Sequence, residues 1–235
     1  MYFLDPIIPS ENTGVGYLAP IPIYQKIFDD DSLHEVIYEK GKLVLSPDQK
    51  RMGQELPDQY DAERQSIMNQ VETRDMWVED TERPPIGSRF FVPPNDFLDL
   101  DIPEVKLLRE RIVQEFDYFL DILQLNRNKP AEITESWMQY YNPYEGRGHN
   151  QHSHGRWHPS EEPELGFSGG YYLSDGDPIK DHPYSGMFTF HVRGYSYYIR
   201  PRKGMLMMWP NDIVHSVKPF YGKTHRCVIN FNIQK

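Results

Sequence analysis

The sequence predicts an antiparallel β-sandwich or jelly roll with a helical layer contributed from upstream, and three observations support this. From residue 132 onward, short apolar stretches alternate with turn residues, as in antiparallel strands. Upstream, one long segment has the three- and four-residue apolar spacing of an amphipathic helix. The chain has 235 residues, of which 38% are hydrophobic, and this is enough to bury a sizeable core.

The strands predicted in the C-terminal half are short apolar or aromatic runs separated by Gly, Pro, Asn and Asp. β-Branched and aromatic side chains favour strands, and the intervening residues favour turns. Such a series is typical of two antiparallel layers packed face to face. The runs occupy residues 133–141, 167–174, 186–192, 195–201, 204–210, 212–220 and 225–233.

The clearest upstream element is an amphipathic helix over residues 101–125. Asp101 is its expected N-cap, and Pro103 lies in the first turn, where proline is tolerated. The apolar side chains recur at steps of three and four, so they are expected to lie on a core. They are Val105, Leu108, Ile112, Phe116, Phe119, Leu120 and Leu123.

The rest of the N-terminal half is less regular. Residues 21–28 have the pattern of a strand. Residues 34–45 resemble a helix end or a strand that passes through Gly41 into another short strand. Residues 46–100 are polar and rich in proline, which predicts long surface loops with one helix near 62–72.

These elements predict one domain over residues 1–235 whose fold is mainly β with flanking α. A layer of helices and loops, residues 1–130, is expected to pack on a β core formed by residues 131–235. No internal repeat or low-complexity segment interrupts this organisation.

Charge and composition narrow the possible classes of function. The formal net charge is −10, and the one compact basic group lies at residues 197–204, so nucleic acid is not expected as a partner. No apolar run is long enough to span a membrane, and the first residues lack the features of a signal peptide. Cys227 is the single cysteine and is expected to be a buried, inert thiol. These features predict a cytoplasmic protein.

Four of the nine histidines fall within residues 149–158. His152 and His154 are two residues apart, and side chains at this spacing on a strand point to the same face, so both imidazoles can meet one ion. Far downstream, His215 lies in a strand-like context, and Arg226 follows on the last predicted strand. This combination predicts a metal site with a cationic side chain nearby.

The motifs around these residues resemble those of the iron(II)/2-oxoglutarate-dependent oxygenases, and more closely a phage and bacterial branch of that superfamily. The likeness covers residues 130–235 and depends on the order and spacing of the motifs rather than on any one of them. They are Ser136-Trp137, His152-Ser-His154, Ser168-Gly-Gly-Tyr171-Tyr172, GMLMMWP ahead of His215, and Arg226 through Phe231-Asn232.

The resemblance implies a double-stranded β-helix, the cupin-like form of the jelly roll. It implies that His152 and His215 bind Fe(II), which 2-oxoglutarate chelates through its 2-oxo acid end. Arg226 is then expected to bind the far carboxylate, assisted by Tyr172 in preference to Tyr171. The implied reaction uses O₂ to hydroxylate an unactivated C–H bond of a peptide, amino acid or small metabolite, while 2-oxoglutarate becomes succinate and CO₂.

One departure concerns His154, because most of the superfamily has Asp or Glu at this position. Three interpretations are open. His154 is itself the third ligand; or Glu161 or Glu162 folds back to supply a carboxylate; or the position is left to a water or halide. We favour the first, and the third is the least favoured because histidine is not small.

Two rival functions from other classes remain. A cupin-like iron enzyme with three histidines would act without 2-oxoglutarate and would not need Arg226. A non-catalytic jelly roll, such as a virion or carbohydrate-binding protein, would hold a structural metal with a closed coordination sphere. The remaining histidines of the cluster, His149 and His158, are interpreted as loop residues. The sequence leaves the substrate and the oligomeric state open.

Overall fold

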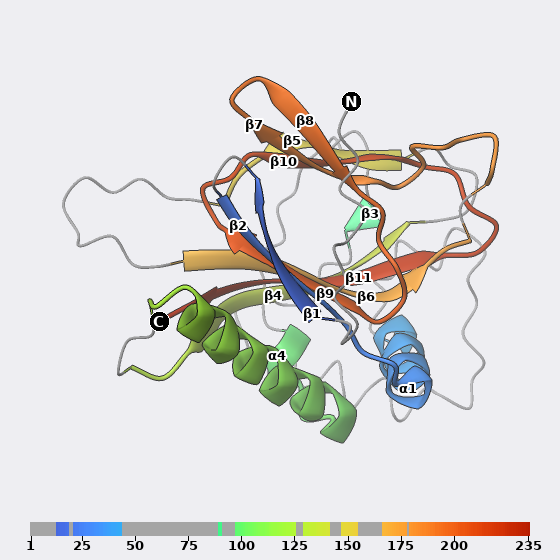
Figure 1. The fold of residues 1–235 in the computed structure, drawn as a ribbon. Helices are drawn as coiled ribbons and strands as arrows, with labels where there is room; N and C mark the ends of the chain where they lie inside the picture. Colours follow the sequence, from blue (N-terminus) through green and yellow to red (C-terminus); the bar gives the residue numbers. More distant parts are fainter. Residues whose placement is uncertain are drawn as a thin grey trace, which may run out of the picture.

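Two antiparallel β-sheets and a layer of helices make up the described part of the chain (Figure 1). The computed structural model describes residues 13–18, 21–43, 89–90, 97–125, 129–141, 147–154, 166–177 and 179–235. Helices α1 (Asp31–Leu43) and α4 (Pro103–Ile122) lie on the side of the larger sheet that faces away from the smaller sheet. This arrangement confirms the predicted jelly roll, mainly β with flanking helices.

The larger sheet has seven strands in the order β1-β2-β9-β6-β11-β4-β3. β11 lies between β6 and β4 and pairs antiparallel with both. In its ladders Asn232 lies opposite Glu135 of β4 and Ser168 of β6, so three distant segments meet at one level of the sheet. The strand bounds are β1 Thr13–Leu18, β2 Ile21–Ile27, β3 Arg89–Phe90, β4 Glu132–Tyr141, β6 Gly166–Asp175, β9 Met205–Pro210 and β11 Arg226–Gln234.

The smaller sheet has four strands in the order β5-β10-β7-β8. Its strand β5 was not among the predicted strands, because the polar histidine cluster carries no apolar alternation. β5 pairs antiparallel with β10, and His152 lies opposite His215 in that ladder. The strand bounds are β5 Arg147–His152, β7 Phe188–Val192, β8 Tyr195–Ile199 and β10 His215–Phe220.

The N-terminal layer contains more than the helices and loops expected over residues 1–130. β1, β2 and β3 come from this region and extend the larger sheet, with β2 covering the edge of β9. The strand expected to follow Gly41 is wrong, because α1 continues through this residue to Leu43. The helix expected near 62–72 lies outside the described residues.

Helix α4 occupies the predicted segment but begins one residue later than Asp101 would require. Its N-cap is Ile102, whose backbone is extended, as expected for a residue before proline. Asp101 instead pairs with Lys106 on the helix surface. No helix in the described segments is long and apolar enough to cross a membrane.

Two apolar clusters hold these layers together. The first lies between the helices and the larger sheet, where Phe116 and Phe119 of α4 both meet the ring of Phe167 edge-on. The second lies between the two sheets and includes Phe190 and Trp209. Only the second borders the histidines, so the space between the sheets positions the candidate site.

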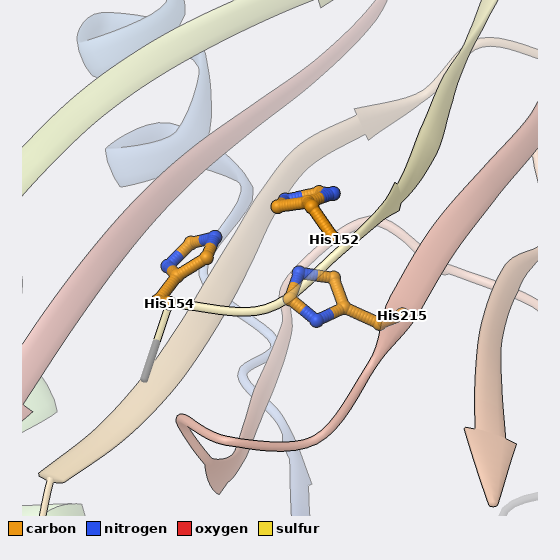
Figure 2. A group of neighbouring side chains, drawn as sticks. All are labelled: His152, His154 and His215. Atoms are coloured by element: carbon orange, nitrogen blue, oxygen red, sulfur yellow. The ribbon is translucent and has the colours of Figure 1, made fainter. Parts of the chain in front are cut away.

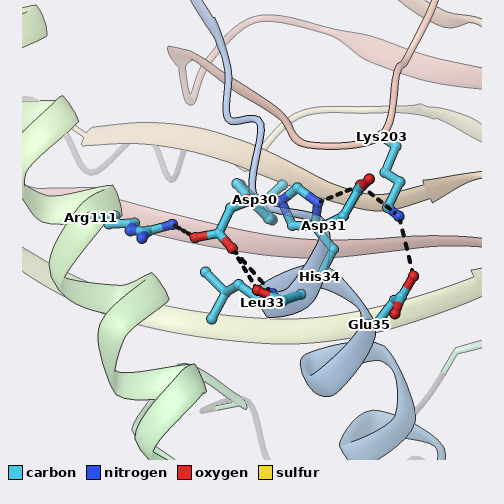
Figure 3. A network of polar contacts seen from close by, with 9 residues as sticks. Asp30, Asp31, Leu33, His34, Glu35, Arg111 and Lys203 are labelled. Atoms are coloured by element: carbon cyan, nitrogen blue, oxygen red, sulfur yellow. Dashed lines mark hydrogen bonds and ion pairs between the residues drawn. The ribbon is translucent and has the colours of Figure 1, made fainter.

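A polar network fastens α1 to the outer face of the larger sheet (Figure 3). Asp30 accepts a hydrogen bond from the first-turn amide of Leu33, which caps the helix, and from Arg111 of α4 at 2.8 Å. Lys203, from the turn before β9, pairs with Asp31 at 2.8 Å. The buried His34 ring contacts the hydroxyl of Tyr171 on β6.

Candidate metal centre

Three histidines converge where the two sheets approach each other (Figure 2). His152 ends β5, His154 follows two residues later, and His215 begins β10. Each offers a ring nitrogen, and these nitrogens lie within 4.8 Å of one another. Four-coordinate and octahedral metal sites both accept ligand atoms at such separations, so the described chain presents three candidate ligands for one ion.

The main chain determines the tautomer of two of these rings. His152 Nδ1 lies 2.8 Å from the carbonyl oxygen of Asn150, and His215 Nδ1 lies 2.9 Å from that of Ile213. A carbonyl oxygen can only accept a hydrogen bond, so both Nδ1 atoms carry the proton. The lone pair is therefore left on Nε2, the nitrogen available for a metal.

His154 is held in the same tautomer, but by a side chain rather than by the main chain. Its Nδ1 lies 2.7 Å from Oδ1 of Asn232 on β11. Its backbone N–H donates to the carbonyl oxygen of Asn211 at 2.9 Å, which anchors the segment after β5. The sequence did not pair Asn232 with a histidine, because the two residues lie 78 positions apart in the chain.

The environment favours the neutral form of His149, His152 and His215. Burial, which is the main cause, and the neighbouring His152, His154 and His149 together lower the pKa of His215 to about 3, although the hydrogen bond to the Ile213 carbonyl opposes the change. Burial likewise lowers the pKa of His149 to about 4 and the pKa of His152 below its ordinary value. The neutral imidazole is the form that binds a metal.

The histidines open into a pocket between the sheets. Phe188 stacks on the His215 ring at 5.3 Å and Trp209 meets it edge-on at 5.1 Å, so an apolar wall excludes water on this side. The other lining residues come mainly from β4, β6 and β11. They are Trp137, Gln139, Tyr141, His149, Gly169, Tyr172, Val217, Arg226, Val228 and Asn230.

Arg226 is a buried cation at the far side of this pocket, with 1% of its surface exposed. Its Nη1 donates to the carbonyl oxygen of Gly186, whereas Nε and Nη2 have no hydrogen-bond partner within the described part of the chain. The rings of Tyr141 and Tyr172 lie 4.9 Å and 5.3 Å from the guanidinium and stabilise it partly. A buried charge without a counter-ion is costly, so this pocket is suited to an anion.

Other polar atoms of the pocket are also hydrogen-bond donors. Among the described residues, Trp137 Nε1, Gln139 Nε2 and the Tyr141 hydroxyl are buried and have no partner. The acceptor of Gln139 is occupied, because Asn230 Nδ2 donates to its Oε1 at 3.1 Å. A cavity lined by free donors fits a ligand rich in acceptors.

The sequence missed Tyr141, Gln139 and Trp137 as pocket residues. They occupy alternate positions on β4, and that alternation was visible in the sequence. The pairing of Tyr141 with Arg226 across the β4–β11 ladder was not, because it joins segments far apart in the chain.

The predicted site residues lie as follows. Tyr172 lines the pocket, whereas Tyr171 points to the helix side and contacts His34. His149 is on β5 and lines the pocket, so its interpretation as a loop residue is wrong. His158, Glu161 and Glu162 lie outside the described residues.

Comparisons with known proteins place the fold. No protein-family model and no curated protein sequence matches the chain. Among solved structures, AviO1 from Streptomyces viridochromogenes Tue57 is 17% identical, with a TM-score of 0.53 over 92% of this chain and 90% of AviO1. A prolyl-4-hydroxylase from Pseudomonas putida is 14% identical, with a TM-score of 0.51 over 93% of this chain and 87% of that enzyme. EvdMO1 is 12% identical, with a TM-score of 0.54 over 92% of this chain but 47% of its own length.

At such identities the likeness establishes the fold and not the activity. The two antiparallel sheets and their flanking helices agree with that fold. The chain therefore has the double-stranded β-helix fold, the form of jelly roll that it shares with these solved structures.

Proposed function

We propose that the chain is an Fe(II)/2-oxoglutarate-dependent dioxygenase that hydroxylates a C–H bond. One observation carries the proposal: a single pocket contains three histidines with free Nε2 lone pairs and a buried arginine that has no counter-ion among the described residues. The first set suits a divalent metal, and the second suits the carboxylate of a metal-chelating acid. The fold, which supports oxygenases of this class, is consistent with both.

The residues of the pocket would have separate roles in binding the metal and the co-substrate. His152, His154 and His215 would hold the iron. Arg226 would bind the far carboxylate of 2-oxoglutarate through its free N–H groups, with the Tyr141 hydroxyl as a further donor. When bound, the metal and co-substrate supply the oxidising chemistry, in which 2-oxoglutarate and O₂ become succinate and CO₂ and one oxygen atom enters the substrate.

Tyr172 is suited to the same carboxylate, because it lines the pocket beside the guanidinium. Burial raises the pKa of this phenol above its ordinary value, and the charge of Arg226 opposes the increase. The hydroxyl therefore keeps its proton at neutral pH and can donate a hydrogen bond to an anion.

A second candidate is a three-histidine iron enzyme that acts without 2-oxoglutarate. It is favoured by His154, because three histidines would leave the iron without the negative charge of a carboxylate ligand. It gives no role to Arg226, whose Nε and Nη2 have no partner in the described part of the chain, and for this reason we place it second. The substrate, a peptide, amino acid or small metabolite, and the cytoplasmic location stay predictions.

The proposal can be tested by adding Fe(II) and then 2-oxoglutarate to the metal-free protein without oxygen. We expect the visible charge-transfer band of an iron–oxo-acid chelate. His215→Ala should abolish the band, because it removes a buried ligand. His191→Ala is the matched control, because His191 is on β7 outside the pocket lining and should leave the band unchanged.

The outcomes separate the candidate functions. Iron binding with no band at saturating 2-oxoglutarate would overturn the co-substrate and favour the second candidate. Absence of iron binding would overturn the metal centre itself. A band in both variants would mean that 2-oxoglutarate binds iron elsewhere on the protein.

A further inference from the structure

Glu135 is a carboxylate close to the metal centre that the proposed reaction does not use. It lies on β4 opposite Asn232 of β11, and Asn232 Nδ2 donates to its Oε2 at 2.8 Å. On the other side of the same amide, Oδ1 accepts from the Ser168 hydroxyl at 2.9 Å and lies 2.7 Å from His154 Nδ1. Glu135, Asn232 and His154 thus form a series of hydrogen bonds that ends on a candidate metal ligand.

The chemistry of these groups determines which atom donates and which accepts in each of these hydrogen bonds. A carboxylate has acceptors only, so the NH₂ group of Asn232 must face Glu135. The amide oxygen is then turned toward His154 and can only accept, which places the ring proton on Nδ1. The lone pair of His154 is left on Nε2, as it is for the other two rings.

His154 differs from its two neighbours in how this tautomer is maintained. Backbone carbonyls orient His152 and His215, and no substitution alters those acceptors. His154 depends on an amide, and an amide can rotate to exchange its donor and acceptor ends. Glu135 is the group that prevents this exchange. It also places a negative charge near a ligand set of neutral histidines.

We propose that Glu135 is a positioning residue that, through Asn232, keeps His154 in the tautomer that binds the metal. This inference depends on the proposed metal centre and is independent of 2-oxoglutarate. Groups that orient a metal-bound histidine typically change metal affinity by about 10–100-fold.

The experiment measures Co(II) binding to the full chain, since Co(II) is stable in air and its absorption reports histidine ligands. Glu135→Gln keeps size and shape but removes the acceptor-only group, so we expect about tenfold weaker Co(II) binding. Glu132→Gln makes the same change at an exposed position of the same strand and should leave the affinity unchanged.

An exchange variant separates orientation from packing. In the double variant Glu135→Gln with Asn232→Asp, the aspartate accepts from His154 and Ser168, and the new glutamine donates to it. The acceptor facing His154 is restored, so Co(II) affinity should recover most of the loss. A ¹⁵N NMR measurement on the metal-free protein should show the Nδ1–H tautomer of His154 in the natural sequence and a tautomer mixture in Glu135→Gln.

Each outcome has one meaning. If the natural sequence binds no Co(II), the metal centre itself is wrong. If it binds Co(II) and Glu135→Gln binds equally well with the same tautomer, only the positioning role is overturned. If Glu135→Gln binds weakly and the exchange variant, folded by circular dichroism, does not recover, the loss comes from packing and the proposal is also overturned.

Discussion

Tyr171 and Tyr172 are neighbours on β6, yet they point to opposite faces of the larger sheet. Tyr171 faces the helices, where it contacts His34 within an apolar core closed by α1 and α4. Tyr172 faces the smaller sheet, where it lies beside an arginine with unused donors. On the helix side, the buried polar atoms that lack partners among the described residues are scattered, whereas on the pocket face several of them gather in one cavity.

Buried polar atoms without partners indicate a binding site when several of them line one cavity. Buried polar groups normally find partners within the protein, because an unsatisfied one destabilises the folded state. When several donors remain free in one cavity, a ligand is the simplest partner for them. Substitutions on the helix face should therefore lower stability, whereas substitutions on the pocket face should lower the affinity for the ligand.

The largest expected effect on stability is on the helix face. Leu108→Ala removes a fully buried side chain of α4 and should lower the free energy of unfolding by about 2–5 kcal/mol. The adjacent Leu107, which is 41% exposed, provides the matched control, and Leu107→Ala should cost about 0.5 kcal/mol or less. Urea denaturation measures both. Co(II) affinity of the folded protein should not change, and a parallel loss of metal affinity would break the comparison.

The pocket face should respond in the opposite way. Arg226→Met removes a buried charge and replaces it with an apolar side chain of similar length, so stability should be unchanged or increased. Affinity for 2-oxoglutarate should fall by about 100-fold, as expected when a buried charge-assisted contact is lost. Binding is measured by titration of the Co(II)-loaded protein, with exposed Arg202→Met as the control. If Arg226→Met destabilises the fold as Leu108→Ala does and keeps 2-oxoglutarate affinity, the arginine is structural.

The smallest effect concerns pH and His34. Burial and the charge of Lys203 lower the pKa of this histidine in the folded state, outweighing Asp30 and Asp31, while Arg111 adds to the lowering. The unfolded chain therefore takes up a proton first as the pH falls below about 6.5, so the stability contributed by neutral His34 is complete above this pH and is lost as the pH falls further.

His34→Asn should flatten this pH dependence, by at most one proton or about 1.4 kcal/mol per pH unit. The free energy of unfolding, measured between pH 5 and pH 7.5, should fall less steeply in the variant than in the natural sequence. The pocket histidines contribute equally to both proteins and cancel in the difference. Equal slopes would show that His34 does not titrate differently in the folded state.

Local pattern was enough to predict several elements and two of the candidate ligands. The i, i+3, i+4 spacing of Val105, Leu108 and Ile112 predicted α4, whose apolar face is buried as expected. The spacing of His152 and His154 indicated that both could meet one ion, and the structure brings them together with His215. β5 was missed because its polar residues carry none of the apolar alternation by which the other strands were recognised.

Local pattern was therefore sufficient for the helix, most strands and the grouping of His152 with His154, because periodicity and spacing are properties of a single segment, whereas His215 was added by the order of motifs along the chain. Three features depend on the tertiary structure. One face of β4 lines the pocket, Tyr141 lies beside Arg226, and Glu135 is linked to His154 through Asn232. These contacts arise from the register of strands that are distant in sequence. Register depends on how the sheets pack as a whole, and no local pattern contains that information.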